Sequence, residues 1–232
     1  MLRIYRVSEG ARQPHDLAIG DVSQVLLSGG LALVPTETVY GIGVTVGAYS
    51  IDGSGSGLVP GGSTGYGRMF ALKQRDVSQT VPWLVAGEED LDAYGEDVDE
   101  RTRVLARAFW PGALTLVVRA SKAVPAFMRA ADGTVALRAS ASPVVQALIQ
   151  ACGSPLAVTS ANTHGAPAPA AFADVEPRVL RGVDVAVDAG RAACCEASTI
   201  VSFAHGGLEV IREGALSSSQ IERSLNRAAA CS

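Results

Sequence analysis

Short apolar runs alternate with amphipathic stretches along most of the chain. Apolar runs bounded by turn residues predict buried strands, and apolar residues three and four positions apart predict helices. The predicted strands are 2–7, 31–34, 39–43, 81–85, 113–119, 134–138, 156–159, 183–187, 197–203 and 208–212. The predicted helices are 16–28, 68–73, 99–109, 143–152, one that ends near 180, and 217–229. Because strands and helices alternate, we expect an α/β fold with a largely buried, mixed sheet.

The segment Gly30–Gly43 shows how one predicted strand ends. Its apolar run stops at Pro35, which cannot donate to a sheet ladder and fixes its own φ. Thr36, Glu37 and Thr38 follow before the next apolar run. Ordinary turn chemistry accounts for such residues. However, open α/β sheets also bind their ligands at the carboxyl ends of strands, so a binding site is the alternative.

Two segments lack a regular pattern. Residues 53–67 hold seven glycines in fifteen positions, so we expect neither a helix nor a strand there. Their spacing matches neither the dinucleotide-binding fingerprint nor the P-loop, which favours a surface loop or lid. The acidic stretch 88–100 predicts a solvated surface.

Composition predicts a single globular domain over residues 1–232, because 48% of residues are hydrophobic and 18% are charged. The net charge of −4 argues against a general nucleic-acid binder but leaves room for a local basic cavity. Cysteines 152, 194, 195 and 231 do not have zinc-site spacing. We find no secretory leader and no apolar run of the ~20 residues that span a bilayer, so we expect a cytoplasmic protein without membrane contact.

Polar residues collect at the ends of the predicted strands. Cations there would neutralise phosphates, and hydroxyl or amide groups would fix their geometry. These clusters are 36–38, Lys73 with Arg75, 115–119, Arg138, Ser160 with Asn162, 198–199 and Arg212. A nucleophile–base pair is not visible, since His15, His164 and His205 fall in predicted loops, and paired carboxylates are absent from the strand ends. Covalent hydrolase and glycosidase chemistry therefore have little support.

Taken in order, seven motifs of the chain resemble those of the YrdC/TsaC family of threonylcarbamoyl-adenylate synthases. Together they extend over about residues 17–227. The motifs are Pro35-Thr-Glu-Thr-Val-Tyr-Gly41, Lys73-x-Arg75, Trp110-Pro-Gly-Ala-Leu-Thr115, Leu137-Arg138, Thr159-Ser-Ala-Asn162 with Gly165, Ser198-Thr-Ile-Val201, and Ile211-Arg-Glu-Gly214.

The resemblance implies a twisted open α/β sheet, flanked by helices, with a large concave basic cavity. It also implies that ATP, bicarbonate and L-threonine yield threonylcarbamoyl-AMP and pyrophosphate. Partner proteins would then transfer the threonylcarbamoyl group to a tRNA adenosine. Mg²⁺ is expected to bridge the ATP phosphates, without a dedicated metal site of protein carboxylates.

Residue roles follow from the resemblance alone. Lys73 and Arg75 would bind the ATP phosphates and carry the catalytic charge. The other expected nucleotide contacts are Thr115, Ser160, Asn162 and Arg212. The expected contacts to the amino-acid substrate are Thr36, Arg119, Arg138 and Ser198.

The chain departs from the family pattern at the glycine-rich segment 53–67, at Asp76 with Thr80–Trp83, and at Thr163–His164. These changes put the identity of the substrate in question more than the fold. One alternative is therefore carbamoyl-adenylate chemistry on another amine or acceptor. Two others are a non-catalytic module for double-stranded RNA and an inactive partner subunit.

Overall fold

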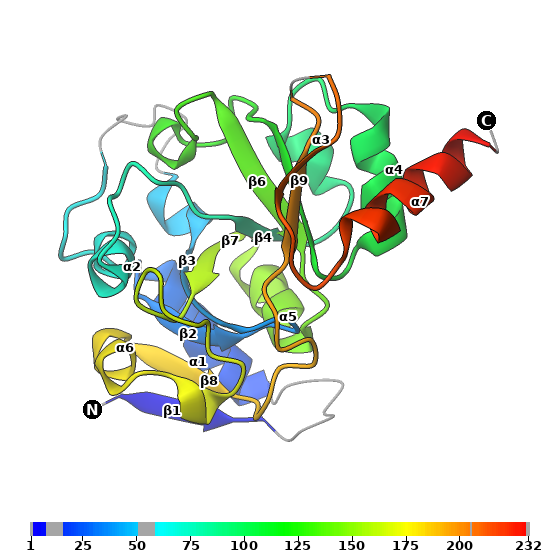
Figure 1. Ribbon diagram of the computed structural model, residues 1–232. Coiled ribbons are helices and arrows are strands. Elements are labelled where there is room, and N and C mark those ends of the chain that lie inside the picture. The colour runs from blue at the N-terminus through cyan, green and yellow to red at the C-terminus, as the bar shows by residue number, and fades with distance from the viewer. Residues whose placement is uncertain (1, 8–15, 51–58, 205, 231–232) are drawn as a thin grey trace.

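The structure, a computed structural model, describes residues 2–7, 16–50, 59–204 and 206–230. His15, His205 and residues 53–58 of the glycine-rich segment lie outside the described residues. Within them, one ten-stranded sheet has the strand order β1-β8-β2-β3-β7-β4-β6-β5-β9-β10 (Figure 1). The strands are β1 (Arg3–Arg6), β2 (Ala32–Pro35), β3 (Tyr40–Thr45), β4 (Trp83–Val85), β5 (Leu114–Arg119), β6 (Thr134–Ala139), β7 (Leu156–Ser160), β8 (Val185–Asp188), β9 (Thr199–Ser202) and β10 (Glu209–Arg212).

Helices cover both faces of this sheet. The helices are α1 (Asp16–Leu27), α2 (Gly65–Lys73), α3 (Asp90–Tyr94), α4 (Glu100–Phe109), α5 (Pro143–Cys152), α6 (Pro177–Gly182) and α7 (Ser218–Ala229). Parallel pairs such as β1–β8 and β5–β9 mix with antiparallel pairs such as β2–β3 and β5–β6. The predicted α/β fold with a mixed sheet is therefore confirmed.

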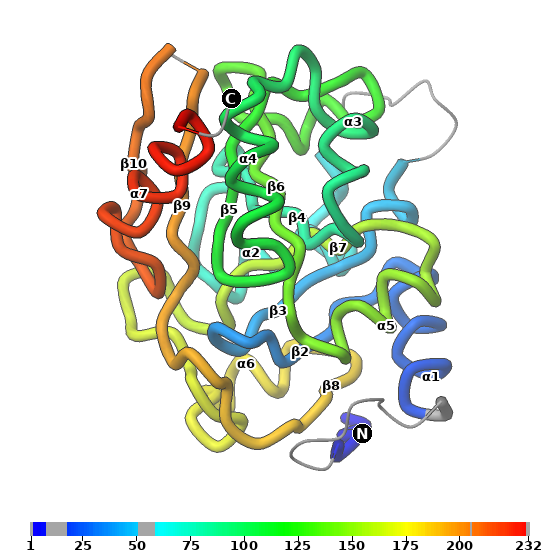
Figure 2. The backbone as a smooth tube through the Cα atoms, turned by 90° about the vertical axis from the view of Figure 1, so that its right-hand side faces the viewer, coloured from blue at the N-terminus to red at the C-terminus, as the bar shows by residue number. Residues whose placement is uncertain are grey.

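The two faces of the sheet carry separate apolar clusters. Helices α1 and α5 pack side by side and bury Val22 and Leu148 against Leu84, Leu156 and neighbouring strand residues (Figure 2). The larger cluster on the other face centres on the fully buried Trp83 and Phe70. Side chains alternate between faces along each strand, so Leu84 and Trp83 serve opposite clusters.

The cavity described below lies on the same face as Leu84. Leu84 pairs with Arg138 across β4 and β6, and Arg138 shares its face of β6 with Thr134 and Ala136. On the neighbouring β5, Val117 pairs with Ala136. All five of these residues line one cavity. The part of the same face that lies nearer β2 is covered by α1 and α5.

One prediction of local structure was wrong, and one helix was not predicted. Helix α2 begins at Gly65, inside the segment expected to hold no helix, because the hydroxyl of Thr64 accepts from the N–H of Gly67 and caps it. A Cβ at Gly65 would lie 2.6 Å from the carbonyl oxygen of Gly29, so glycine allows a close approach here. Helix α3, which the sequence did not predict, forms within the acidic stretch 88–100 and buries Leu91, while most other residues of this stretch are exposed or partly exposed, as expected for a solvated surface.

Candidate functional site

A cavity of about 490 Å³ opens on the face of the sheet that carries Leu84, Ala136 and Arg138. Nine of the ten residues singled out from the sequence line it, although they come from segments far apart in the chain: Thr36, Lys73, Arg75, Thr115, Arg138, Ser160, Asn162, Ser198 and Arg212. Four of them are cationic, and Asp132 is the carboxylate that lines the cavity with them. Among the described residues, the lining therefore carries excess positive charge that favours an anionic ligand.

Lys73 ends α2 and is only 4% exposed. Its Nζ donates to the carbonyl oxygens of Ser160 at 2.7 Å and Asn162 at 3.0 Å. It also reaches Oγ of Ser160 at 3.3 Å and Oδ1 of Asn162 at 3.2 Å. Burial lowers the pKa of Lys73 to about 8, and the charge of Arg75 adds to this, while Glu176 opposes it. Neutral oxygens thus hold this ammonium in place.

A second group of contacts fixes the turn that carries Asn162. The side-chain amide of Asn162 donates to the carbonyl oxygens of Thr163 at 3.0 Å and Ala166 at 2.5 Å. Thr163 donates from its backbone and its hydroxyl to Glu176. His164, which lines the cavity, donates its backbone N–H to the carbonyl oxygen of Lys73 at 3.0 Å. The end of α2 and the turn after β7 are therefore held together.

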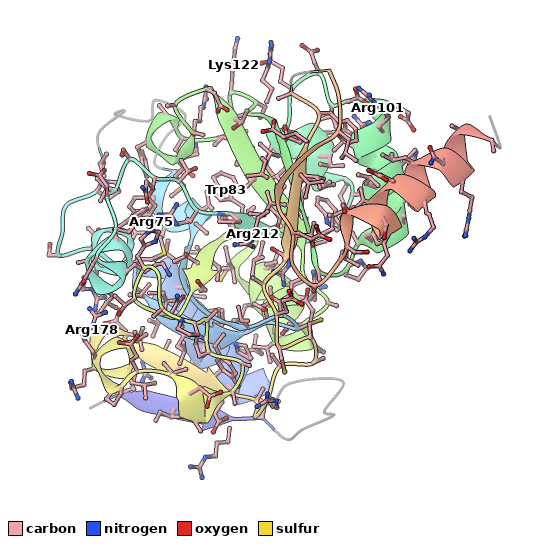
Figure 3. All side chains as sticks on the ribbon, viewed as in Figure 1. Arg75, Trp83, Arg101, Lys122, Arg178 and Arg212 are labelled. Carbon is pink, nitrogen blue, oxygen red and sulfur yellow. The ribbon has the colours of Figure 1, made fainter. Side chains whose placement is uncertain are left out.

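Arg75 and Arg212 line the cavity from different segments (Figure 3). Arg75 follows α2, and its guanidinium donates to Oε1 of Gln79 at 2.7 Å and to the carbonyl oxygen of Thr80 at 2.9 Å. Arg212 ends β10, and its Nε and Nη2 donate to the carbonyl oxygen of Ser198 at 3.1 Å and 2.7 Å. Burial lowers the pKa of both guanidinium groups, and the charge of Arg138 lowers that of Arg212 further.

Arg138 forms a buried ion pair at the Arg212 side of the cavity. Its Nη2 donates to Oε1 of Glu37 at 2.7 Å, and the two side chains are 7% and 12% exposed. The Nε of Arg138 is buried and has no hydrogen-bond partner among the described residues. Nearby, the hydroxyls of Thr115 and Ser198 lie 2.8 Å apart. The buried, unpaired Nε–H of Arg138 costs folding free energy, and a hydrogen-bond acceptor on a ligand would satisfy it.

The hydroxyl of Thr36 closes the turn after β2. It donates to the carbonyl oxygen of Val39 at 2.6 Å and accepts from the backbone N–H groups of Thr38 and Val39. It also lies 2.8 Å from the hydroxyl of Thr38. The sequence left a turn and a binding site as alternatives, and in the structure Thr36 and Thr38 both belong to a turn and line the cavity, whereas Glu37 does not line it.

Arg119 is the predicted residue that the structure does not bring into this cavity. It shares a face of β5 with Thr115 and Val117 but lies two residues beyond Val117, at the end of the strand. There it lines a separate cavity of about 370 Å³ together with Glu96 and Asp97.

Sequence reasoning missed several lining residues, including Asp132 and Thr134. Thr134 could have been found from Arg138, because positions two and four residues away on a strand share its face. Asp132 precedes the strand in a turn, where its Oδ1 accepts from the hydroxyl of Thr134 at 2.7 Å. Loop placement of this kind leaves no periodic signal in the sequence.

Residues 2–7, 16–50, 59–204 and 206–230 are the part of the chain that the structure describes. They contain no group of three or more His, Cys, Asp or Glu side chains that could hold a metal ion. They also contain no helix long and apolar enough to cross a bilayer.

Comparison with known proteins gives a consistent result. The family model for Sua5, YciO and YrdC, described as telomere recombination, matches residues 63–214. The threonylcarbamoyl-AMP synthase of Pyrococcus abyssi is 30% identical over 195 residues, which cover 84% of this chain and 53% of that protein. A putative threonylcarbamoyl-AMP synthase of Mycobacterium tuberculosis is 33% identical over 210 residues, 90% of both chains. The chain thus spans about half of the first relative and most of the second.

Solved structures show the same fold. Sua5 of P. abyssi, in a structure described as complexed with L-threonine, matches with a TM-score of 0.82 at 28% identity, over 95% of this chain and 60% of that chain. Escherichia coli YciO matches with a TM-score of 0.76 over 92% of this chain and 96% of that chain. At 19% identity, the likeness to YciO supports the fold alone.

Proposed function

The chain belongs to the Sua5/YciO/YrdC family, and on that premise we propose that it makes L-threonylcarbamoyl-adenylate from ATP, bicarbonate and L-threonine, with release of pyrophosphate. The observation that carries the proposal is the meeting of nine motif residues in one basic cavity. The named activity of the relatives and the threonine complex of P. abyssi Sua5 support the choice of substrates.

Lys73 and Arg75 form the phosphate side of the proposed site. The ammonium of Lys73 has only neutral oxygens as hydrogen-bond partners in the described chain, so its charge is not cancelled by a bonded carboxylate. Ser160 and Asn162 hold it, and they offer a hydroxyl and an amide beside it. A triphosphate needs this combination of concentrated charge and fixed polar groups.

Arg138, Arg212 and Ser198 form the amino-acid side of the proposed site. The guanidinium of Arg212 lies against Ser198, so we assign Arg212 to the amino-acid carboxylate rather than to the nucleotide. The buried, unpaired Nε of Arg138 would supply a second donor to the same group. Thr115 shares a hydroxyl contact with Ser198 and would lie between the two sides. Thr36 would form part of the cavity wall at the turn after β2.

The reaction suits a site without a protein nucleophile. The threonine amine first condenses with bicarbonate to a carbamate, with loss of water. A carbamate oxygen then attacks the α-phosphorus and pyrophosphate leaves. Cations that hold the phosphates in line stabilise the charge that develops on the transferred group. The described residues offer no acidic cage for Mg²⁺, so Mg²⁺ would arrive bound to the ATP phosphates.

The product would pass to partner proteins that place the threonylcarbamoyl group on a tRNA adenosine, and this would take place in the cytoplasm. Direct contact with RNA would depend on the cavity, because the net charge of the chain is −4.

Pyrophosphate release in the presence of ATP and bicarbonate, measured across a panel of amino acids, tests the proposed function. We expect release that depends on L-threonine, with a product of the mass of threonylcarbamoyl-AMP. Release with another amine but not with threonine would favour the alternative of a different acceptor. Failure to bind ATP in calorimetry would instead favour an inactive partner subunit.

A further inference from the structure

Glu37 connects three segments of the protein without lining the cavity itself. Its Oε1 accepts from Nη2 of Arg138 on β6, and its Oε2 accepts from the hydroxyl of Ser140 just beyond that strand. Its backbone carbonyl oxygen accepts from the N–H of Cys194 at 2.8 Å. The segment after Cys194 leads to Ser198, which holds Arg212. The lining of the cavity, as described, includes Arg138 and Ser198 but not Glu37.

The guanidinium of Arg138 needs such an anchor. Among the described residues, its hydrogen bond to Glu37 is the one that orients it, since its Nε has no partner. The second cation, Arg212, is close enough for Arg138 to lower its pKa, so the two guanidinium groups repel each other. Without a carboxylate beside it, a buried guanidinium would turn away from its neighbour or toward water.

The carboxylate of Glu37 is itself held in one orientation by its two hydrogen bonds. Both oxygens of Glu37 are engaged, and its side chain is only 12% exposed. Ser140 is fully buried, so its hydroxyl serves Glu37 rather than a ligand. Two cations, Arg138 and Arg212, and one bonded anion leave one excess positive charge, which matches a single carboxylate.

We infer that Glu37 is a positioning residue for the amino-acid substrate: it fixes the orientation of Arg138 so that the free donor of this guanidinium meets the substrate carboxylate. The inference rests on the proposed function, because it takes the ligand of Arg138 to be L-threonine. Glu37 itself does not touch the substrate and acts through Arg138.

Two variants separate positioning from charge. Glu37→Ala removes the anchor, and we expect the KM for L-threonine to rise about 30-fold with the KM for ATP changed less than about twofold. Glu37→Gln keeps an amide oxygen that accepts from Nη2 and an amide nitrogen that donates to Ser140. It should therefore restore the KM for threonine to within about fivefold of the wild type. Steady-state pyrophosphate release measures both.

A double-variant cycle tests whether Glu37 acts through Arg138. The variant that combines Glu37→Ala with Arg138→Ala should have the same KM for threonine as Arg138→Ala alone. Asp184→Asn is the matched control, because Asp184 pairs with Arg68 at another cavity of the molecule. It removes an arginine–carboxylate pair and should leave both KM values unchanged.

The outcomes are distinct. A threonine KM within twofold of the wild type in Glu37→Ala, an equal rise in both KM values, or additive effects in the double variant would overturn the inference. If Glu37→Ala does not fold by circular dichroism, Ser140→Ala takes its place, with an expected rise of about threefold in the threonine KM and overturning by an unchanged value. A wild type that releases no pyrophosphate with threonine would contradict the proposed function instead.

Discussion

Lys73 and Arg138 are two buried cations of the same cavity, and the protein stabilises their charges in different ways. Lys73 lies among neutral oxygens of Ser160 and Asn162. Arg138 lies against the carboxylate of Glu37 at 2.7 Å. Neutral oxygens orient the ammonium but leave its charge whole, so burial lowers the pKa of Lys73 to about 8. A carboxylate instead fixes the guanidinium and offsets part of its field.

This difference suits two kinds of ligand group. A polyanionic phosphate needs concentrated positive charge, and the Lys73 side provides it at a cost in stability. A single carboxylate needs planar donors in a fixed orientation, and the Arg138 side provides them. The comparison can be tested at each side in turn.

Replacing Lys73 should have the largest effect. Lys73→Met keeps the length of the side chain but removes the charge at the phosphate side, so we expect ATP turnover to fall on the order of a thousandfold with the fold intact. Pyrophosphate release and circular dichroism measure this. Lys122→Met is the control, because Lys122 is exposed and points away from the molecule (Figure 3). Turnover near the wild-type level in Lys73→Met would remove the assigned phosphate role.

The free energy of unfolding should fall more in Arg138→Met than in Lys73→Met. Arg138→Met leaves the carboxylate of Glu37 buried without its partner, and we expect a loss of about 3 kcal/mol in the free energy of unfolding. Lys73→Met should change this free energy by less than about 1 kcal/mol, because it removes a buried charge that has no bonded counter-charge. Urea denaturation measures both variants.

An exposed ion pair serves as the control for that measurement. Arg101 pairs with Asp99 at 2.6 Å, and both side chains are partly exposed. Arg101→Ala should therefore cost at most about 1 kcal/mol. Equal losses in Arg138→Met and Lys73→Met would contradict the contrast between the two cations.

A change in pH should have the smallest effect. Since the pKa of Lys73 is lowered to about 8, its ammonium loses its proton as the pH rises through that value. The charged form is the one proposed to bind phosphate, so the Kd for ATP should rise by about tenfold between pH 7 and pH 9. Lys73→Arg keeps its charge and should flatten this rise. Calorimetry between pH 7 and pH 9 measures it, and a flat wild-type profile would contradict the assignment.

Much of the fold could be predicted from local patterns. The apolar runs before Pro35 and after Gly112 became β2 and β5, and the amphipathic stretch after Ser217 became α7. Helices were missed where the apolar periodicity was weak. The start of α2 at Gly65 lies in the glycine-rich segment, and α3 lies in the acidic stretch 88–100. In both places tertiary contacts outweighed local propensity.

The candidate site was predicted as a set of residues but not as a geometry. The motif resemblance named nine of the lining residues. It also named Arg119, which lies at the end of β5 and lines a different cavity, and it did not indicate that Arg212 donates to the carbonyl oxygen of Ser198. Distances across a sheet depend on strand order and register, and single motifs do not encode them.

The sequence by itself determined the alternation of strands and helices, the end of β2 at Pro35, and the chemical groups available at the strand ends, because these depend on neighbouring residues. Only the tertiary structure decided which of these groups meet. It brought Lys73 to Ser160 and Asn162, and it brought Glu37 to Arg138, 101 positions away along the chain. The physical reason is that a buried charge requires partners, and the packing of distant strands determines which partners it finds.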